Sequence, residues 1–96
     1  MDRLQLLLCK LAEEAAEVSQ VALKAQQFGL SEKHAAQEAT NSQLIQKELT
    51  DLIAVVLMLN DEFEFGFELD EIAMSLKRHR INQYAKRSQT LGHVTT

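Results

Sequence analysis

The sequence contains no proline, no tryptophan, only three glycines and a single cysteine. Without proline, and with Ala, Leu, Glu, Lys and Gln dominating, helix is favoured over nearly the whole chain. Cys9 cannot form a disulfide within the chain, which indicates a reducing compartment, so we predict a cytoplasmic protein. Because Cys9 follows three leucines, we also predict that it is a small core residue.

Other features that are absent exclude whole classes of function. No apolar run is long enough to span a membrane, and the N-terminal apolar stretch is too short for a signal peptide. A formal net charge of −4 gives no reason to expect nucleic-acid binding. There is no Gly-rich phosphate loop, no readable Ser-His-Asp arrangement and no CxxC, and the histidines lack metal-ligand spacing. Any phosphate would therefore be bound by a metal ion and basic side chains.

The 96 residues allow one small domain, and no segment has convincing strand periodicity. Helical spacing predicts three long helices, over about residues 2–27, 42–62 and 70–86. It also predicts one short polar helix over about residues 32–38. Gly29 is a natural end for the first helix, and Thr40-x-x-Gln43 is a capping box before the next. We predict an all-α domain over 1–87, a small helical bundle, followed by a flexible C-terminal tail over 88–96.

One segment of this predicted bundle, Leu49–Leu59, is apolar around almost the whole circumference of a helix. Such a helix should be buried. A chain this short buries a modest fraction of its surface, so the segment suggests that dimerisation completes the core.

Two acidic signatures lie on consecutive long helices: Glu13-Glu14-x-x-Glu17 and Glu48-x-x-Asp51. Carboxylates three residues apart are neighbours on one helical face. If the two helices pack antiparallel, both pairs can converge on one pocket, where their charges must be neutralised. Protons, basic partners and metal ions are the three alternatives. Mg²⁺ takes such oxygen ligands and shares its coordination sphere with substrate phosphates.

At these residues the chain resembles a known family. The segments 10–18 (KLAEEAAEV) and 48–52 (ELTDL) are similar to the EExxE and ExxD motifs of the MazG-like all-α nucleoside-triphosphate pyrophosphohydrolases. The resemblance spans about residues 4–86. It implies a helical bundle that forms a homodimer or a dimer of dimers. It also implies Mg²⁺-dependent hydrolysis of a nucleoside triphosphate to the monophosphate and pyrophosphate, with Mn²⁺ as an alternative ion.

The resemblance also implies roles for particular residues. The metal ligands would be Glu14, Glu17, Glu48 and Asp51. Glu13 and Glu14 would be the catalytic carboxylates, with Glu13 orienting water rather than binding the metal. Substrate would be bound by residues of the last helix, Lys77, Arg78, Asn82 and Lys86.

Two alternatives remain open at this point. Phosphoribosyl-ATP pyrophosphohydrolase of histidine biosynthesis carries a similar pair of acidic motifs. A non-catalytic helical dimerisation module would instead leave the glutamates solvated and tolerate Asp51→Asn. The basic cluster of the last helix also fits a solvated face that complements the helix dipole. Aromatic residues are scarce, so the preferred base and sugar stay open.

Overall fold

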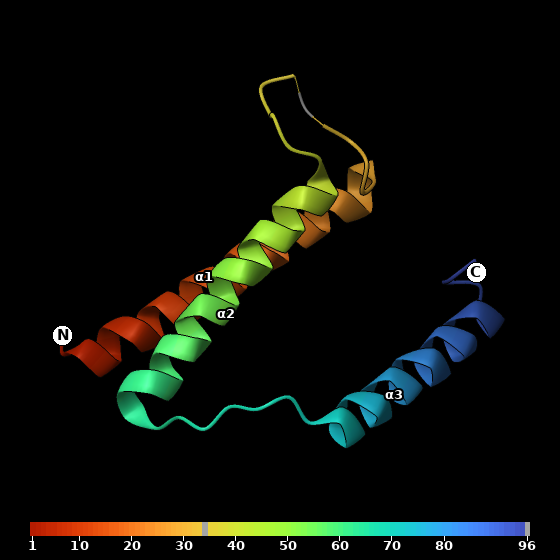
Figure 1. Ribbon diagram of the computed structural model, residues 1–96. Helices are drawn as coiled ribbons and strands as arrows, with labels where there is room; N and C mark the ends of the chain where they lie inside the picture. Colours follow the sequence, from red (N-terminus) through yellow and green to blue (C-terminus); the bar gives the residue numbers. More distant parts are fainter. Residues whose placement is uncertain (34, 96) are drawn as a thin grey trace.

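The computed structural model describes residues 1–33 and 35–95. Within these ranges the chain forms three helices and no strand: α1 (Arg3–Phe28), α2 (Asn41–Phe63) and α3 (Glu71–Thr90) (Figure 1). The all-α prediction is confirmed. The short helix predicted at 32–38 is wrong for the described residues, which form turns and irregular backbone; residue 34 lies outside them. Helix α3 also continues to Thr90, so the predicted tail begins inside it.

Local capping interactions set where the first two helices begin. At α1 the Gln5 N–H donates to the Asp2 carboxylate (2.8 Å), and the Asp2 N–H donates to the Gln5 side chain (2.9 Å). The same reciprocal pair forms at α2 between Thr40 and Gln43, at 3.2 and 2.9 Å. Both arrangements satisfy N–H groups that a helix start leaves unpaired. Gly29 ends α1 with a φ of 93°, so the predictions for Gly29 and for the Thr40 box are confirmed.

Helices α1 and α2 lie side by side and antiparallel, as a hairpin (Figure 1). The core between them consists of the buried side chains Leu7, Ala25, Val55 and Leu59. At the open end, the Arg3 guanidinium donates to both oxygens of Glu62, at 2.8 and 3.0 Å. At the connected end, the buried amide of Asn41 donates to the Gly29 carbonyl (2.9 Å). These two contacts hold the register that places the two acidic motifs opposite each other.

Helix α3 stands apart from this hairpin. None of its Cα atoms lies within 8 Å of a Cα of α1 or α2. The radius of gyration is 16.9 Å, against about 12–13 Å for a compact chain of this length. The prediction that Leu49–Leu59 is buried all round is wrong for the single chain. Leu49, Ile53 and Leu57 are 43%, 45% and 52% exposed.

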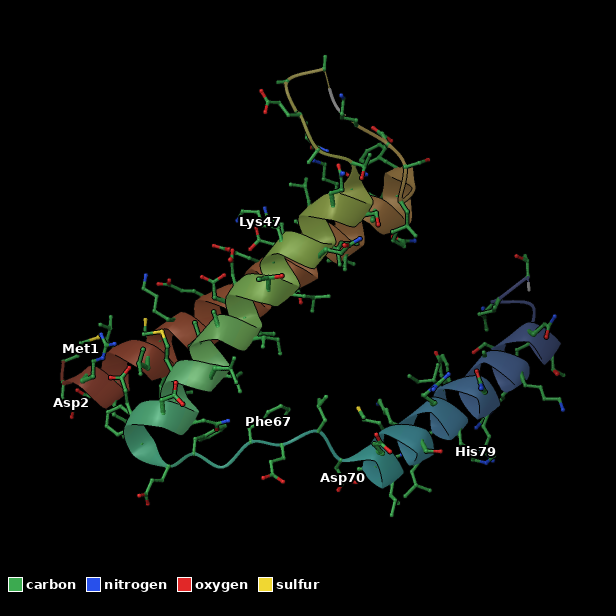
Figure 2. All side chains as sticks on the ribbon, viewed as in Figure 1. Met1, Asp2, Lys47, Phe67, Asp70 and His79 are labelled. Atoms are coloured by element: carbon green, nitrogen blue, oxygen red, sulfur yellow. The ribbon has the colours of Figure 1, made fainter. Side chains whose placement is uncertain are left out.

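The connection between α2 and α3 is extended but tied to the end of α2. The Asn60 side chain donates to the Phe67 carbonyl (3.0 Å) and accepts from the Phe67 N–H (2.9 Å). Gly66, just before, has a φ of 76°, which glycine adopts without strain. The Asp70 carboxylate then caps α3 by accepting from the Ala73 N–H (2.9 Å). Figure 2 shows Phe67 and Asp70 along this connection, which carries α3 away from the hairpin.

Candidate functional site

The antiparallel hairpin brings three of the predicted carboxylates together. One oxygen each of Glu14 and Glu17 on α1 and Glu48 on α2 lies within 4.8 Å of the others. Glu14 and Glu48 are half-buried, whereas Glu17 is exposed. The spacing within each motif puts its acids on one face of its helix, and the helix pairing makes the two faces meet.

The one cation described at the three carboxylates is the exposed Lys47 ammonium, 3.5 Å from Glu48 Oε1. The Oε2 atoms of Glu14 and Glu48 are buried and have no hydrogen-bond partner. A hydrogen bond with the Glu17 carboxyl, and then burial, raises the pKa of Glu48; the nearby Lys47 acts in the opposite direction. Because two carboxylates can share a hydrogen bond only when one is protonated, the cluster needs a proton or a cation to become neutral. Oxygen atoms so arranged are suitable ligands for a hard divalent ion.

Two predicted site residues lie beside this cluster and are held in ion pairs. The Asp51 carboxylate accepts from the Lys47 ammonium at 3.0 Å and is 41% exposed, so it stands outside the three-carboxylate set. The Glu13 carboxylate accepts from Lys10 at 3.0 Å, and the Cys9 thiol lies 3.8 Å from its other oxygen. Cys9 is exposed, so its predicted place in the core is wrong.

The sequence interpretation had not assigned these two lysines to the site. Lys47 also lies 3.5 Å from Glu48, and it is exposed at the surface of α2 (Figure 2). The spacing of Lys10 to Glu13 and of Lys47 to Asp51, three and four residues, was a signal that could have identified them. They are the basic side chains nearest to the carboxylates among the described ion pairs.

The predicted substrate residues are not brought to the carboxylates within one chain. All four lie on α3, are exposed, and share its separation from the hairpin: Lys77, Arg78, Asn82 and Lys86. In a single chain the candidate site is therefore the hairpin part alone.

Comparison with protein-family models gave no match, and neither did comparison with curated proteins or with solved structures. The family resemblance therefore rests on the two acidic motifs. Across residues 1–33 and 35–95, no helix combines the length and the hydropathy needed to cross a membrane.

Proposed function

We propose that the protein is a cytoplasmic, Mg²⁺-dependent nucleoside-triphosphate pyrophosphohydrolase that works as a homodimer or a dimer of dimers. The reaction would convert an NTP or dNTP to the monophosphate and pyrophosphate. The observation that carries the proposal is the meeting of Glu14, Glu17 and Glu48, two of which have a buried oxygen without a partner. Burying an unpaired polar atom is costly, and a bound cation would remove that cost.

The donor set fits the ion. Glu14, Glu17 and Glu48 supply carboxylate oxygens from two rigid helices, and Asp51 would be the fourth ligand. Asp51 is available because its present partner, Lys47, is an exposed side chain that can turn away. When bound there, Mg²⁺ would neutralise phosphate charge and make a coordinated water more acidic. Mn²⁺ has the same ligand preference and is an alternative.

The remaining work falls to side chains of the chain itself. Glu13 would orient the attacking water and accept its proton, and the Lys10 ammonium contacts the Glu13 carboxylate at 3.0 Å. Glu14 is the second candidate for this role. Positive charge for the triphosphate would come from α3, where Lys77, Arg78 and Lys86 can pair with phosphate oxygens. Asn82 would orient the sugar or a phosphate oxygen.

The test is an assay of pyrophosphate release from a panel of ribo- and deoxynucleoside triphosphates, with Mg²⁺ or with EDTA. We expect release only with Mg²⁺. Glu48→Gln and Asp51→Asn should keep their helicity and lose turnover. Asp61→Asn removes an acid from the far end of the same helix and should stay active. Full activity of either site variant would refute the assignment.

With phosphoribosyl-ATP assayed beside the panel, two outcomes would favour the alternatives. Turnover of phosphoribosyl-ATP, but of no triphosphate in the panel, would identify the related histidine-biosynthesis activity. The exposed apolar side chains of α2 favour the other alternative, a non-catalytic helical dimerisation module. That alternative predicts no turnover and no effect of Mg²⁺ on the protein.

A further inference from the structure

An apolar groove follows the side of α2 that faces away from the core. A hollow of about 400 Å³ is lined by Leu49, Thr50, Ile53, Ala54 and Leu57. A second hollow of about 350 Å³ shares Ile53 and Leu57 and continues to the connection at Phe67 and Leu69. At 3.6 residues per turn, Ile53 and Leu57 point to nearly the opposite side of α2 from the buried Val55 and Leu59. The groove is thus a second apolar face of the hairpin.

The accessible surface of the chain is too large for a finished monomer. It measures 7797 Å², whereas a compact monomer of 10.9 kDa exposes about 5,600 Å². The excess of about 2,200 Å² per chain exceeds the roughly 800 Å² that each partner contributes to a standard interface. Summed over two chains, the excess accessible surface falls in the range of about 2,000–5,000 Å² that obligate dimers bury. A second copy of the chain could cover this surface.

The distribution of charge indicates where α3 belongs. Residues 1–63, which contain the hairpin, have ten acidic and five basic residues, a net charge of −5. Residues 71–90 of α3 have one acidic and five basic residues, a net charge of +4. Helix α3 also exposes Ile72, Leu76 and Tyr84. A basic helix with exposed apolar side chains is complementary to an acidic hairpin with an apolar groove.

Helix α3 does not approach the hairpin of its own chain. The two hydrogen bonds between Asn60 and Phe67 hold the connection where it leaves α2, and α3 then lies beyond contact distance of α1 and α2. Exchange of an identical element between protomers is a low-cost route to a dimer, and an element held away from its own core is free to make that exchange.

We propose that two copies of the chain exchange α3. The two hairpins pack through their α2 grooves, and each α3 lies along the hairpin of the other copy. The consequence for the site rests on the proposed function: Lys77 and Arg78 of one copy would serve the carboxylates of the other. Each site would then be incomplete without the second chain.

The exchange itself can be tested without an activity assay. Carbon-13-labelled and unlabelled chains are unfolded, mixed and refolded together, and the mass is measured by light scattering. We expect twice 10.9 kDa, or four times for a dimer of dimers. Isotope-filtered spectra should then show contacts between the Ile72 and Leu76 methyl groups of one copy and hairpin methyl groups of the other. A monomeric mass, a dimer without such contacts, or α3–hairpin contacts within one copy only would overturn the proposal.

A matched pair of variants tests the groove. Leu57→Glu puts a charge into the groove, whereas Leu30→Glu does so at a similarly exposed leucine in the connection between α1 and α2. We expect Leu57→Glu to weaken dimerisation at least 100-fold and Leu30→Glu to leave it unchanged. Unchanged dimerisation of Leu57→Glu would overturn the proposal. If Leu57→Glu lost its helicity by circular dichroism, the isotope-filtered spectra of the wild type would decide.

Complementation tests the shared site. Glu48→Gln and the double variant Lys77→Ala, Arg78→Ala are each expected to be inactive. Refolded together, they should regain about a quarter of wild-type turnover, because half of the dimers are mixed and each has one intact site. No recovery would mean that α3 serves its own hairpin and would overturn this part. If the wild type itself hydrolyses nothing, the proposed function fails, and the spectra alone decide the exchange.

Discussion

Mg²⁺ should stabilise the folded protein, and Glu48→Gln should abolish most of that stabilisation. The Glu48 side chain is only 13% exposed, and its Oε2 is buried without a hydrogen-bond partner beside Glu14 and Glu17. A ligand that binds the folded state alone stabilises it by RT ln(1 + [L]/Kd). The unfolded chain cannot hold the three carboxylates together, so the whole binding energy appears as stability.

The expected size follows from mass action. At an Mg²⁺ concentration of 100 times Kd, the gain is about 2.7 kcal/mol. For a domain of 60–100 residues, 1 kcal/mol shifts Tm by about 4–8 °C, so we expect a rise of about 10–20 °C. If loss of one of the four proposed ligands weakens Mg²⁺ binding 100-fold, the remaining gain is about 0.4 kcal/mol, or about 2–3 °C. Without metal, Glu48→Gln should match or exceed the wild type, because the raised pKa of Glu48 shows that its ionised form is disfavoured.

The assay is thermal unfolding by circular dichroism at fixed protein concentration, with Mg²⁺ or with EDTA. Asp61→Asn is the control, because it removes an acid of α2 that is not part of the carboxylate cluster. It should gain as much from Mg²⁺ as the wild type. An equal gain for Glu48→Gln, or no gain for the wild type, would refute the reasoning.

Three further predictions concern pH, the core and a helix start. In the metal-free protein the raised pKa of Glu48 means that the folded state holds this proton longer than the unfolded state, whose Glu48 titrates near 4.5. Its contribution to stability is therefore lost as pH rises from about 4.5 through the folded-state pKa, and chemical unfolding at several pH values should show that Glu48→Gln lacks this loss. Leu59→Ala should cost about 3–5 kcal/mol in urea unfolding because Leu59 is fully buried, whereas Leu30→Ala should cost under about 0.5 kcal/mol. Thr40→Ala should cost about 1 kcal/mol and Thr40→Ser little, since serine keeps the capping oxygen; equal losses would contradict the capping argument.

The sequence by itself determined the features that depend on residues close to one another along the chain. The three long helices follow from residue spacing, and the start of α2 and the end of α1 follow from Thr40, Gln43 and Gly29. Interactions three or four residues apart decide such features, so they can be read without knowing the fold. The same locality places the acids of each motif on one helical face. The wrong prediction of a short helix at 32–38 has a local reason as well, since a short polar helix has only marginal stability without a packing surface.

Only the tertiary structure decided which groups meet. Glu14, Glu17 and Glu48 come together because α1 and α2 pair in one rotation and register. Because Leu49–Leu59 is apolar on almost all sides, its sequence does not predict which face of the helix is buried within its own chain. The separation of α3 from the hairpin is also a property of the tertiary structure, since no Cα of α3 lies within 8 Å of a Cα of α1 or α2. Contacts between distant residues depend on how whole helices are oriented, and no local pattern in the sequence encodes that orientation.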